Sequence, residues 1–157
     1  MKRTSTLTNP TQHTMTLNKT LTLLTLCALP WLAPTAHAAE AEGIQVETIL
    51  QSTTSWDGTT YPAYPTGQTE LTVLKITIAP HTTLPWHTHP MPNAAYVQSG
   101  ELTVEKAEGG QTRKLVSGDV LPEMVNSSHR GYTGDQPVVL IVFYAGEKRM
   151  PLSKKVY

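Results

Sequence analysis

Short stretches in which hydrophobic and polar residues alternate recur along this chain, and turn signals separate them. Within residues 71–78, the alternation places Leu74, Ile76 and Ile78 on one face of a strand. Val73, Lys75 and Thr77 share the other face. Residues 137–144 are apolar throughout and rich in β-branched side chains. The alternation predicts a half-buried strand, and the continuous apolar run predicts a strand that is covered on both faces.

The same pattern excludes long helices. Residues 102–105 alternate again, and no stretch after residue 38 shows a sustained helical period with capping residues. Turn signals lie between the predicted strands, at Asp57-Gly58, Pro65-Thr66-Gly67, Ser99-Gly100, Gly109-Gly110, Gly118-Asp119 and Gly134-Asp135. Many short strands joined by tight turns predict one all-β domain, either a sandwich or a barrel.

Residues 1–38 have a different composition and predict a signal peptide. Lys19 precedes an apolar run at residues 21–29, and the small residues Ala36 and Ala38 are typical of a cleavage site. The run is too short to span a bilayer. We therefore expect cleavage of this segment and a periplasmic or secreted protein.

The cysteine content and the net charge exclude some chemistry and some partners. Cys27 is the only cysteine and lies in the predicted leader, so the exported chain would lack disulfides and thiol chemistry. A lipoprotein is the alternative, but Leu26 is larger than the residue that lipidation favours. Without the three basic residues of the leader, nine basic and twelve acidic residues remain. We expect no nucleic-acid partner and no membrane association after cleavage.

The histidines point to metal chemistry. After the leader the chain has only His81, His87, His89 and His129. Residues i and i+2 of a strand face the same side, so His87 and His89 can present two imidazoles to one ion. His81 follows Pro80 in a predicted turn, and we expect it not to be a ligand. A third ligand must come from another part of the chain.

Two segments resemble the sequence motifs of the cupin family. Residues 87–100 are similar to the first motif, with Asn93 in place of its glutamate. Residues 118–129 are similar to the second motif with its spacing kept, while Met124 and Thr133 replace its proline and its last asparagine. The resemblance implies a double-stranded jelly-roll barrel, which agrees with the all-β prediction.

The resemblance also implies a metal site and a domain plan. His87, His89 and His129 would bind one divalent transition metal, such as iron, manganese, zinc, nickel or copper, and leave positions open for a ligand. The cupin domain would occupy residues 70–146, between an arm at 39–69 and a tail at 147–157. Pairing of two barrels as a homodimer is a further implication.

Two polar residues modify the expected site. Asn93 is a poorer ligand than a carboxylate, so a three-histidine site would leave the ion its full charge and favour a small anionic or chelating ligand. Glu123 is the candidate catalytic residue, as an acid–base group or as a carboxylate that orients an imidazole. The alternative for Glu123 is a solvated turn charge. Ala95 and Val97 share the face of Asn93, which predicts a small apolar cavity.

The expected function is metal-assisted oxygenation or isomerisation of a small chelating substrate. A non-catalytic metal-binding or ligand-binding protein is the alternative, and a barrel without metal is a third possibility. The aromatic segment 56–65 is expected to pack on the outside of the barrel as a rigid arm, or alternatively to rim a pocket.

Overall fold

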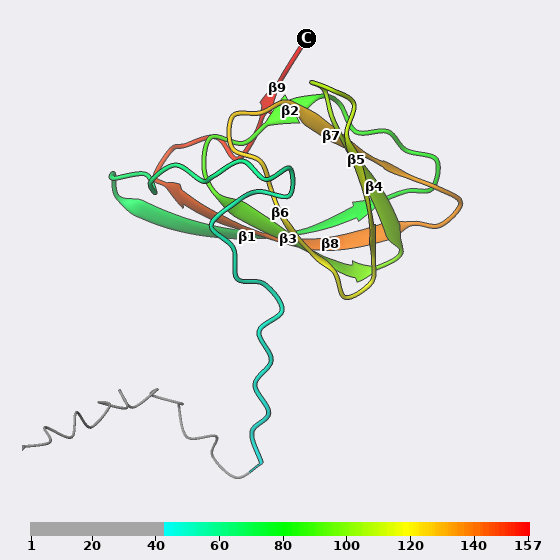
Figure 1. Ribbon diagram of the computed structural model, residues 1–157, viewed down its shortest axis with the longest axis horizontal. Coiled ribbons are helices and arrows are strands. Elements are labelled where there is room, and N and C mark those ends of the chain that lie inside the picture. The colour runs from blue at the N-terminus through cyan, green and yellow to red at the C-terminus, as the bar shows by residue number, and fades with distance from the viewer. Residues whose placement is uncertain (1–42) are drawn as a thin grey trace, which may run out of the picture. The chain divides into compact units, whose positions relative to one another are not determined.

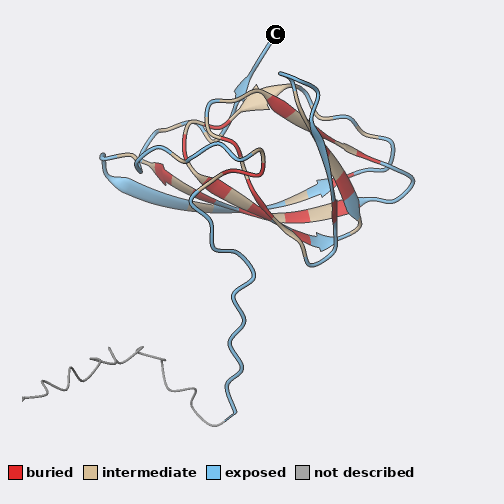
Figure 2. Cartoon of the chain, in the orientation of Figure 1, coloured by how far each residue is buried: buried red, intermediate tan, exposed pale blue. Residues whose placement is uncertain are grey.

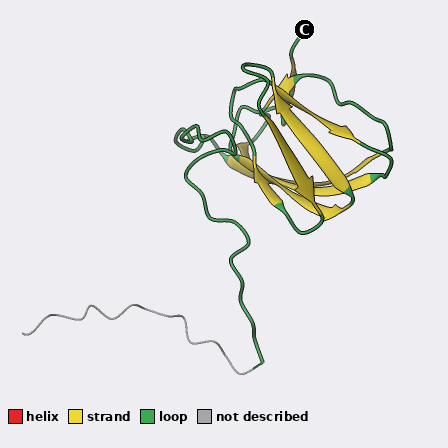
Figure 3. Cartoon of the chain, turned by 45° about the vertical axis from the view of Figure 1, so that its right-hand side comes forward, coloured by secondary structure: helices red, strands yellow, loops and turns green. Residues whose placement is uncertain are grey.

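The computed structural model describes residues 43–157, which form antiparallel β-sheets and, within that range, no helix (Figure 3). The predicted signal peptide and Cys27 lie outside the described residues. No helix long and apolar enough to span a membrane was found in this part of the chain.

The strands form two sheets that face each other (Figure 1). One sheet has the order β1-β8-β3-β6 and the other has the order β5-β4-β7-β2-β9. The strand bounds are β1 (Thr69–Ile78), β2 (His87–Thr88), β3 (Asn93–Ser99), β4 (Glu101–Lys106), β5 (Thr112–Val116), β6 (Val120–Pro122), β7 (His129–Thr133), β8 (Val138–Glu147) and β9 (Lys154–Lys155). The predicted all-β jelly roll is confirmed.

The core lies between the two sheets, because alternate residues of each strand turn inward (Figure 2). Ala95 and Val97 of β3 are buried on one side, and Leu102 and Val104 of β4 are buried on the other. Removal of this apolar surface from water stabilises the barrel by roughly 25 cal/mol per Å². The interior that surrounds the candidate site is therefore closely packed.

Gly100 connects β3 to β4 and so carries the chain from one sheet to the other. Its φ angle is +83°, and a Cβ atom at this position would collide with the carbonyl oxygen of Pro137. A residue with a side chain would be strained there and would also lack space. The turn predicted from the sequence thus depends on glycine for two separate reasons.

The prediction that the apolar run of β8 is covered on both faces was wrong. Val142 and Tyr144 are buried, but Phe143 between them is 43% exposed. β8 pairs with β1 and β3 on its two edges, and hydrogen-bonded neighbours cover the edges of a strand rather than its faces. The outer face of the sheet therefore keeps exposed apolar side chains.

The arm before β1 packs in two ways. Trp56 is only 8% exposed and belongs to the core, so the expectation that the arm aromatics pack on the exterior was wrong for this residue. Tyr61 and Tyr64 instead line a pocket of about 520 Å³, together with Ala94 and Phe143 of the outer sheet face. The alternative prediction, that this segment rims a pocket, describes these tyrosines.

The segment after β8 is part of the second sheet. β9 pairs with β2, with Lys155 opposite His87 and Lys154 opposite Thr88. The backbone N–H of Val156 donates a hydrogen bond to the carbonyl of Trp86 over 2.9 Å. The predicted tail therefore covers the strand that carries His87.

Candidate metal site

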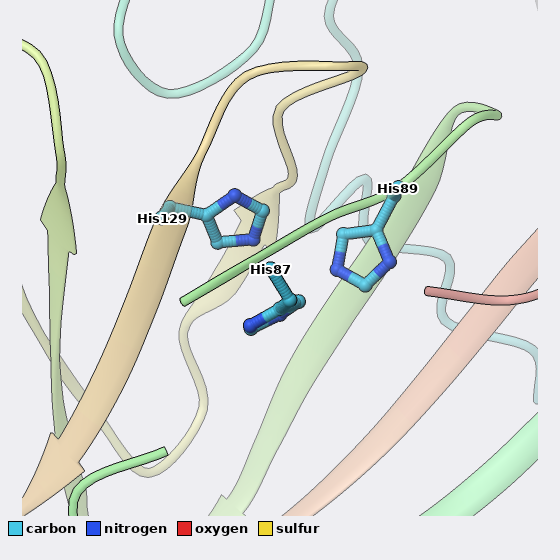
Figure 4. A group of neighbouring side chains, drawn as sticks. All are labelled: His87, His89 and His129. Carbon is cyan, nitrogen blue, oxygen red and sulfur yellow. The ribbon is translucent and has the colours of Figure 1, made fainter. Parts of the chain in front are cut away.

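The three predicted ligands come together in the interior. His87 on β2 lies directly opposite His129 on β7 in the antiparallel register, and His89 bridges to Val125 just beyond β2. Their nitrogen ligand atoms all lie within 4.8 Å of one another, and the imidazoles turn toward one another (Figure 4). This arrangement could hold one metal ion.

Backbone carbonyls fix the orientation of all three rings. Each Nδ1 atom lies within hydrogen-bond distance of a carbonyl oxygen, from His87 to Pro85 at 2.9 Å, from His89 to Leu152 at 2.7 Å and from His129 to Ser127 at 2.9 Å. A carbonyl oxygen can only accept, so each Nδ1 carries the hydrogen. In the neutral ring, Nε2 then keeps its lone pair, which is the common state of a metal-binding histidine.

The electrostatics of His87 and His89 suit a ligand role. Burial lowers the pKa of both imidazoles, because the protonated form loses its hydration. His89 is only 4% exposed. Neutral imidazoles bind metal ions without first releasing a proton.

Glu123 follows β6 and faces His129. Its Oε2 atom lies 3.1 Å from His129 Nε2, and its side chain is 12% exposed, so it is not a solvated turn charge. Burial alone would raise the pKa of Glu123, but the contact with His129 lowers it. Burial alone would lower the pKa of His129, and the Glu123 carboxylate instead raises it. The two groups are tightly coupled in the interior.

Asn93 lies on the inner face of β3, 6% exposed, with the buried Ala95 and Val97. Its Nδ2 atom donates to the carbonyl of Met91 over 3.3 Å, whereas its Oδ1 atom has no hydrogen-bond partner among the described residues. Asn93, Ala95 and Val97 therefore share one buried face of β3, as predicted.

The residues fit a divalent metal. The buried Nε2 of His129 and Oε2 of Glu123 have no hydrogen-bond partner within residues 43–157, although they lie side by side. Buried polar atoms without partners are costly, and a bound cation satisfies both nitrogen and oxygen lone pairs. The Glu123 carboxylate lies beside His129, so the charged groups near an ion here would include one carboxylate that the three-histidine prediction did not count.

His81 lies apart from this cluster. It occupies a turn with a φ angle of +51°, its side chain is 73% exposed, and its Nε2 atom lies 3.5 Å from Asp135. The structure therefore brings together three of the four histidines among residues 43–157.

Two residues that hold the site, Asn126 and Tyr61, were not predicted from the sequence. The backbone N–H of Asn126 donates to the carbonyl of His89 over 2.8 Å, and Asn126 has a φ angle of +57°. Asn126 stands where the second motif has glycine, and asparagine is among the side chains that tolerate this conformation best, so the signal was present. The hydroxyl of Tyr61 donates to the carbonyl of Glu123 over 2.8 Å, and no sequence pattern indicated that bond.

Comparison with known proteins supports the fold. The cupin domain family profile matches residues 74–144. The dimethylsulfoniopropionate (DMSP) lyase DddQ from Ruegeria pomeroyi is similar in structure, with 23% identity and a TM-score of 0.50 over 55% of this chain and 43% of the lyase. The matched region thus spans less than half of that protein. No curated protein matches the chain at a significant level.

Two further structures are similar at lower scores. The polyketide cyclase RemF from Streptomyces resistomycificus is 19% identical, with a TM-score of 0.49 over 59% of this chain and 63% of the cyclase. Oxalate decarboxylase from Bacillus subtilis, described with Mn(II) centres, is 21% identical, with a TM-score of 0.47 over 55% of this chain and 24% of the decarboxylase. The family match and the two facing sheets lead to one conclusion: residues 74–144 form a domain of the cupin type.

Proposed function

We propose that this protein is an exported cupin that binds one divalent transition metal through His87, His89 and His129 and acts on a small anionic chelating ligand. The observation that carries the proposal is the set of three Nδ1 contacts to backbone carbonyls, which leaves three Nε2 lone pairs directed into one small space. If these histidines served only for packing, there would be no need for all three rings to carry their hydrogen on Nδ1 and leave Nε2 unprotonated.

The reaction that this site favours is metal-assisted oxygenation or isomerisation. A bound divalent metal would supply Lewis-acid or redox chemistry to a ligand that coordinates through oxygen. Glu123 Oε2 is placed to accept a proton inside the barrel, and Asn93 Oδ1 is free to accept a hydrogen bond from a ligand. Met91 and Val97, both fully buried, exclude bulk water from the interior.

Elemental analysis of protein purified from its native compartment tests the metal. We expect about one transition metal ion per chain and identify it by the same measurement. A protein that arrives without metal, and that takes up none from iron, manganese, zinc, nickel or copper salts, would contradict the proposal.

The charge of the site supports an anionic ligand. With three neutral imidazoles and one carboxylate, a divalent ion keeps a net positive charge, which attracts an oxygen anion in a low-dielectric interior. Asn93 stands at the position of the motif glutamate, so Asn93→Glu should tighten metal binding and weaken anion binding. Calorimetric titration of both proteins with oxalate, at matched metal occupancy, measures the second effect. Equal or stronger oxalate binding in the variant would contradict the charge argument.

One observation favours the alternative of a non-catalytic binding protein. The pocket of about 520 Å³ is lined by Tyr61, Tyr64 and Phe143, and none of the three metal-site histidines lines it. A larger small molecule in this pocket would contact Asn93, which also lines it, but none of the three histidines. Turnover assays with metal-loaded protein distinguish the two functions, since a binding protein retains its ligand unchanged.

Export and pairing complete the proposal. N-terminal sequencing should show a chain that begins after residue 38, and a secreted form that still begins at Met1 would contradict export.

We propose that a second copy covers the outer sheet face, where Val73 lies opposite Phe143 and both are exposed. Light scattering should give a dimer for the native protein and a monomer for Val73→Glu.

A further inference from the structure

Two lone pairs face each other inside this barrel. His129 Nδ1 carries its hydrogen toward the Ser127 carbonyl, so the neutral ring directs an unprotonated Nε2 at Glu123 Oε2, 3.1 Å away. Neither atom has a hydrogen-bond partner among residues 43–157. Two buried acceptors at this distance repel each other unless a cation satisfies both.

Two kinds of cation could remove the repulsion between His129 Nε2 and Glu123 Oε2. A proton would convert His129 to an imidazolium ion paired with the Glu123 carboxylate. A metal ion would instead bind both atoms. Metal–nitrogen and metal–oxygen bonds are about 2.1 Å long, so two donors on adjacent positions of one ion lie about 3 Å apart. The observed separation of 3.1 Å fits such a pair of donors, and it equally fits a hydrogen bond from a protonated His129 to Glu123, so the binding measurements below decide between the two.

Asn93 differs in that its amide nitrogen is held by the backbone, while its Oδ1 atom also has no hydrogen-bond partner among the described residues. Its amide nitrogen donates to the Met91 carbonyl over 3.3 Å, and this bond holds the side chain. An amide oxygen is also a weaker ligand for a divalent ion than a carboxylate. The carboxylate that the interior offers therefore comes from the segment after β6 and not from β3.

The geometry points to Glu123 as the carboxylate ligand of the metal, adjacent to His129, which would make the site one of three nitrogens and one oxygen. This inference rests on the proposed metal-binding function and adds a ligand to it. The ion would then keep a net charge of about +1, with Asn93 left to contact a ligand or water.

Hydrogen bonds fix the backbone around Glu123, and a metal ligand needs such a fixed position. Its N–H donates to the Asn93 carbonyl over 3.1 Å, and its carbonyl accepts from the Tyr61 hydroxyl over 2.8 Å. The carbonyl of the preceding Pro122 accepts from the N–H of Trp56 over 2.9 Å. Strand β3 and the arm thus fix Glu123 from two sides, which lowers the entropy lost when it binds an ion.

The test compares Glu123→Gln with Asn93→Ala. Glutamine keeps the shape of glutamate and removes its charge. We expect Glu123→Gln to lower Zn²⁺ affinity at least about tenfold in competition with a chromophoric chelator, and Asn93→Ala to change it less than about threefold. The reverse order of effects would overturn the inference. Glu123→Asp, which retains the charge, serves if the glutamine variant does not fold, and we expect it to weaken binding less than tenfold.

Cobalt absorption separates a ligand from a residue that only orients His129. Exchange of a bound carboxylate for an amide, which is a weaker and uncharged ligand, changes the coordination of Co²⁺ and hence its visible spectrum, so we expect the spectrum of Glu123→Gln to differ from that of the native protein. A weaker affinity with an unchanged spectrum would show that Glu123 only pairs with His129. If the native protein binds neither Zn²⁺ nor Co²⁺, the proposed function itself fails. If it binds both and Glu123→Gln binds equally well, only the present inference fails.

Discussion

Asp57 and Glu123 both carry buried carboxylates, on segments that a hydrogen bond between Trp56 and Pro122 joins. The Asp57 side chain is 1% exposed, and its oxygens accept from the Ser55 hydroxyl at 2.6 Å, the Lys106 ammonium at 2.7 Å, and the N–H and hydroxyl of Thr59 at 3.1 Å each. The Glu123 carboxylate instead faces His129, and its Oε2 atom has no hydrogen bond within the described residues.

The difference separates a structural carboxylate from one that is available to a ligand. Hydrogen bonds saturate Asp57, so it ties the arm to β4 and has nothing left to bind. Glu123 is held through its backbone, and its side chain keeps an unused acceptor beside an imidazole. Buried polar atoms without hydrogen-bond partners are uncommon in a packed interior, and the unused acceptor of Glu123 supports its proposed role at the metal.

The largest effect should follow from removing an imidazole. Replacement of His87, His89 or His129 by alanine should weaken metal binding at least about tenfold, because outer contacts alone change affinity by 10–100-fold and these side chains would be ligands. His81→Ala is the matched control and should bind metal as the native protein does. Chelator competition measures the metal affinity of each variant. Equal metal content in all four variants would show that His87, His89 and His129 are not ligands.

Asp57→Asn should affect stability and spare metal binding. Asparagine keeps one acceptor oxygen but leaves a polar donor poorly satisfied, so we expect the free energy of unfolding to fall by about 1 kcal/mol. Urea denaturation measures the change. Asp135→Asn, at a side chain that is 91% exposed, should change stability by less than about 0.5 kcal/mol. A loss of metal affinity in Asp57→Asn would show that the two carboxylates are not independent.

The pH dependence of stability gives a second test of Asp57. Burial alone would raise the pKa of Asp57, but hydrogen bonds from Lys106, Ser55 and Thr59 hold the pKa well below its ordinary value of 3.8. Because the folded protein binds this proton less readily than the unfolded chain, Asp57 contributes stability above pH 3.8 and loses it as the pH falls below that value. Urea denaturation of the native and Asp57→Asn proteins should therefore give converging stabilities below pH 3.8. A constant difference down to pH 2.5 would contradict this origin of the stability.

The smallest effect should come from the arm. Tyr61→Phe removes only the hydroxyl that bonds to the Glu123 carbonyl, and should cost about 0.5–1.5 kcal/mol of stability. We also expect a severalfold loss of metal affinity, because Glu123 would be held less firmly. Tyr64→Phe, at a residue that is 69% exposed, should change neither quantity. Identical metal affinities in the two variants would show that the arm does not position Glu123.

Local geometry explains why much of this fold could be predicted. A strand turns alternate residues to opposite faces, so the pattern around Leu74 and Ile76 placed those residues inward without knowledge of any partner strand. The same rule put His87 and His89 on one side, and Gly100 marked the turn that follows β3. The exposure of Phe143 could not be predicted in this way, because it depends on what lies above the sheet.

The sequence by itself determined three of the strands, several turns and the pair His87 and His89, because each follows from spacing over a few residues. His129 was added by the resemblance of residues 118–129 to the second cupin motif. Only the tertiary structure decided how the site is completed. The bonds from His89 to Leu152 and from Tyr61 to Glu123 join residues 63 and 62 positions apart. Such contacts arise when two sheets and an arm pack together, and no local pattern records them. The contact of Glu123 with His129 depends on the same packing, because the segment after β6 turns this carboxylate toward β7.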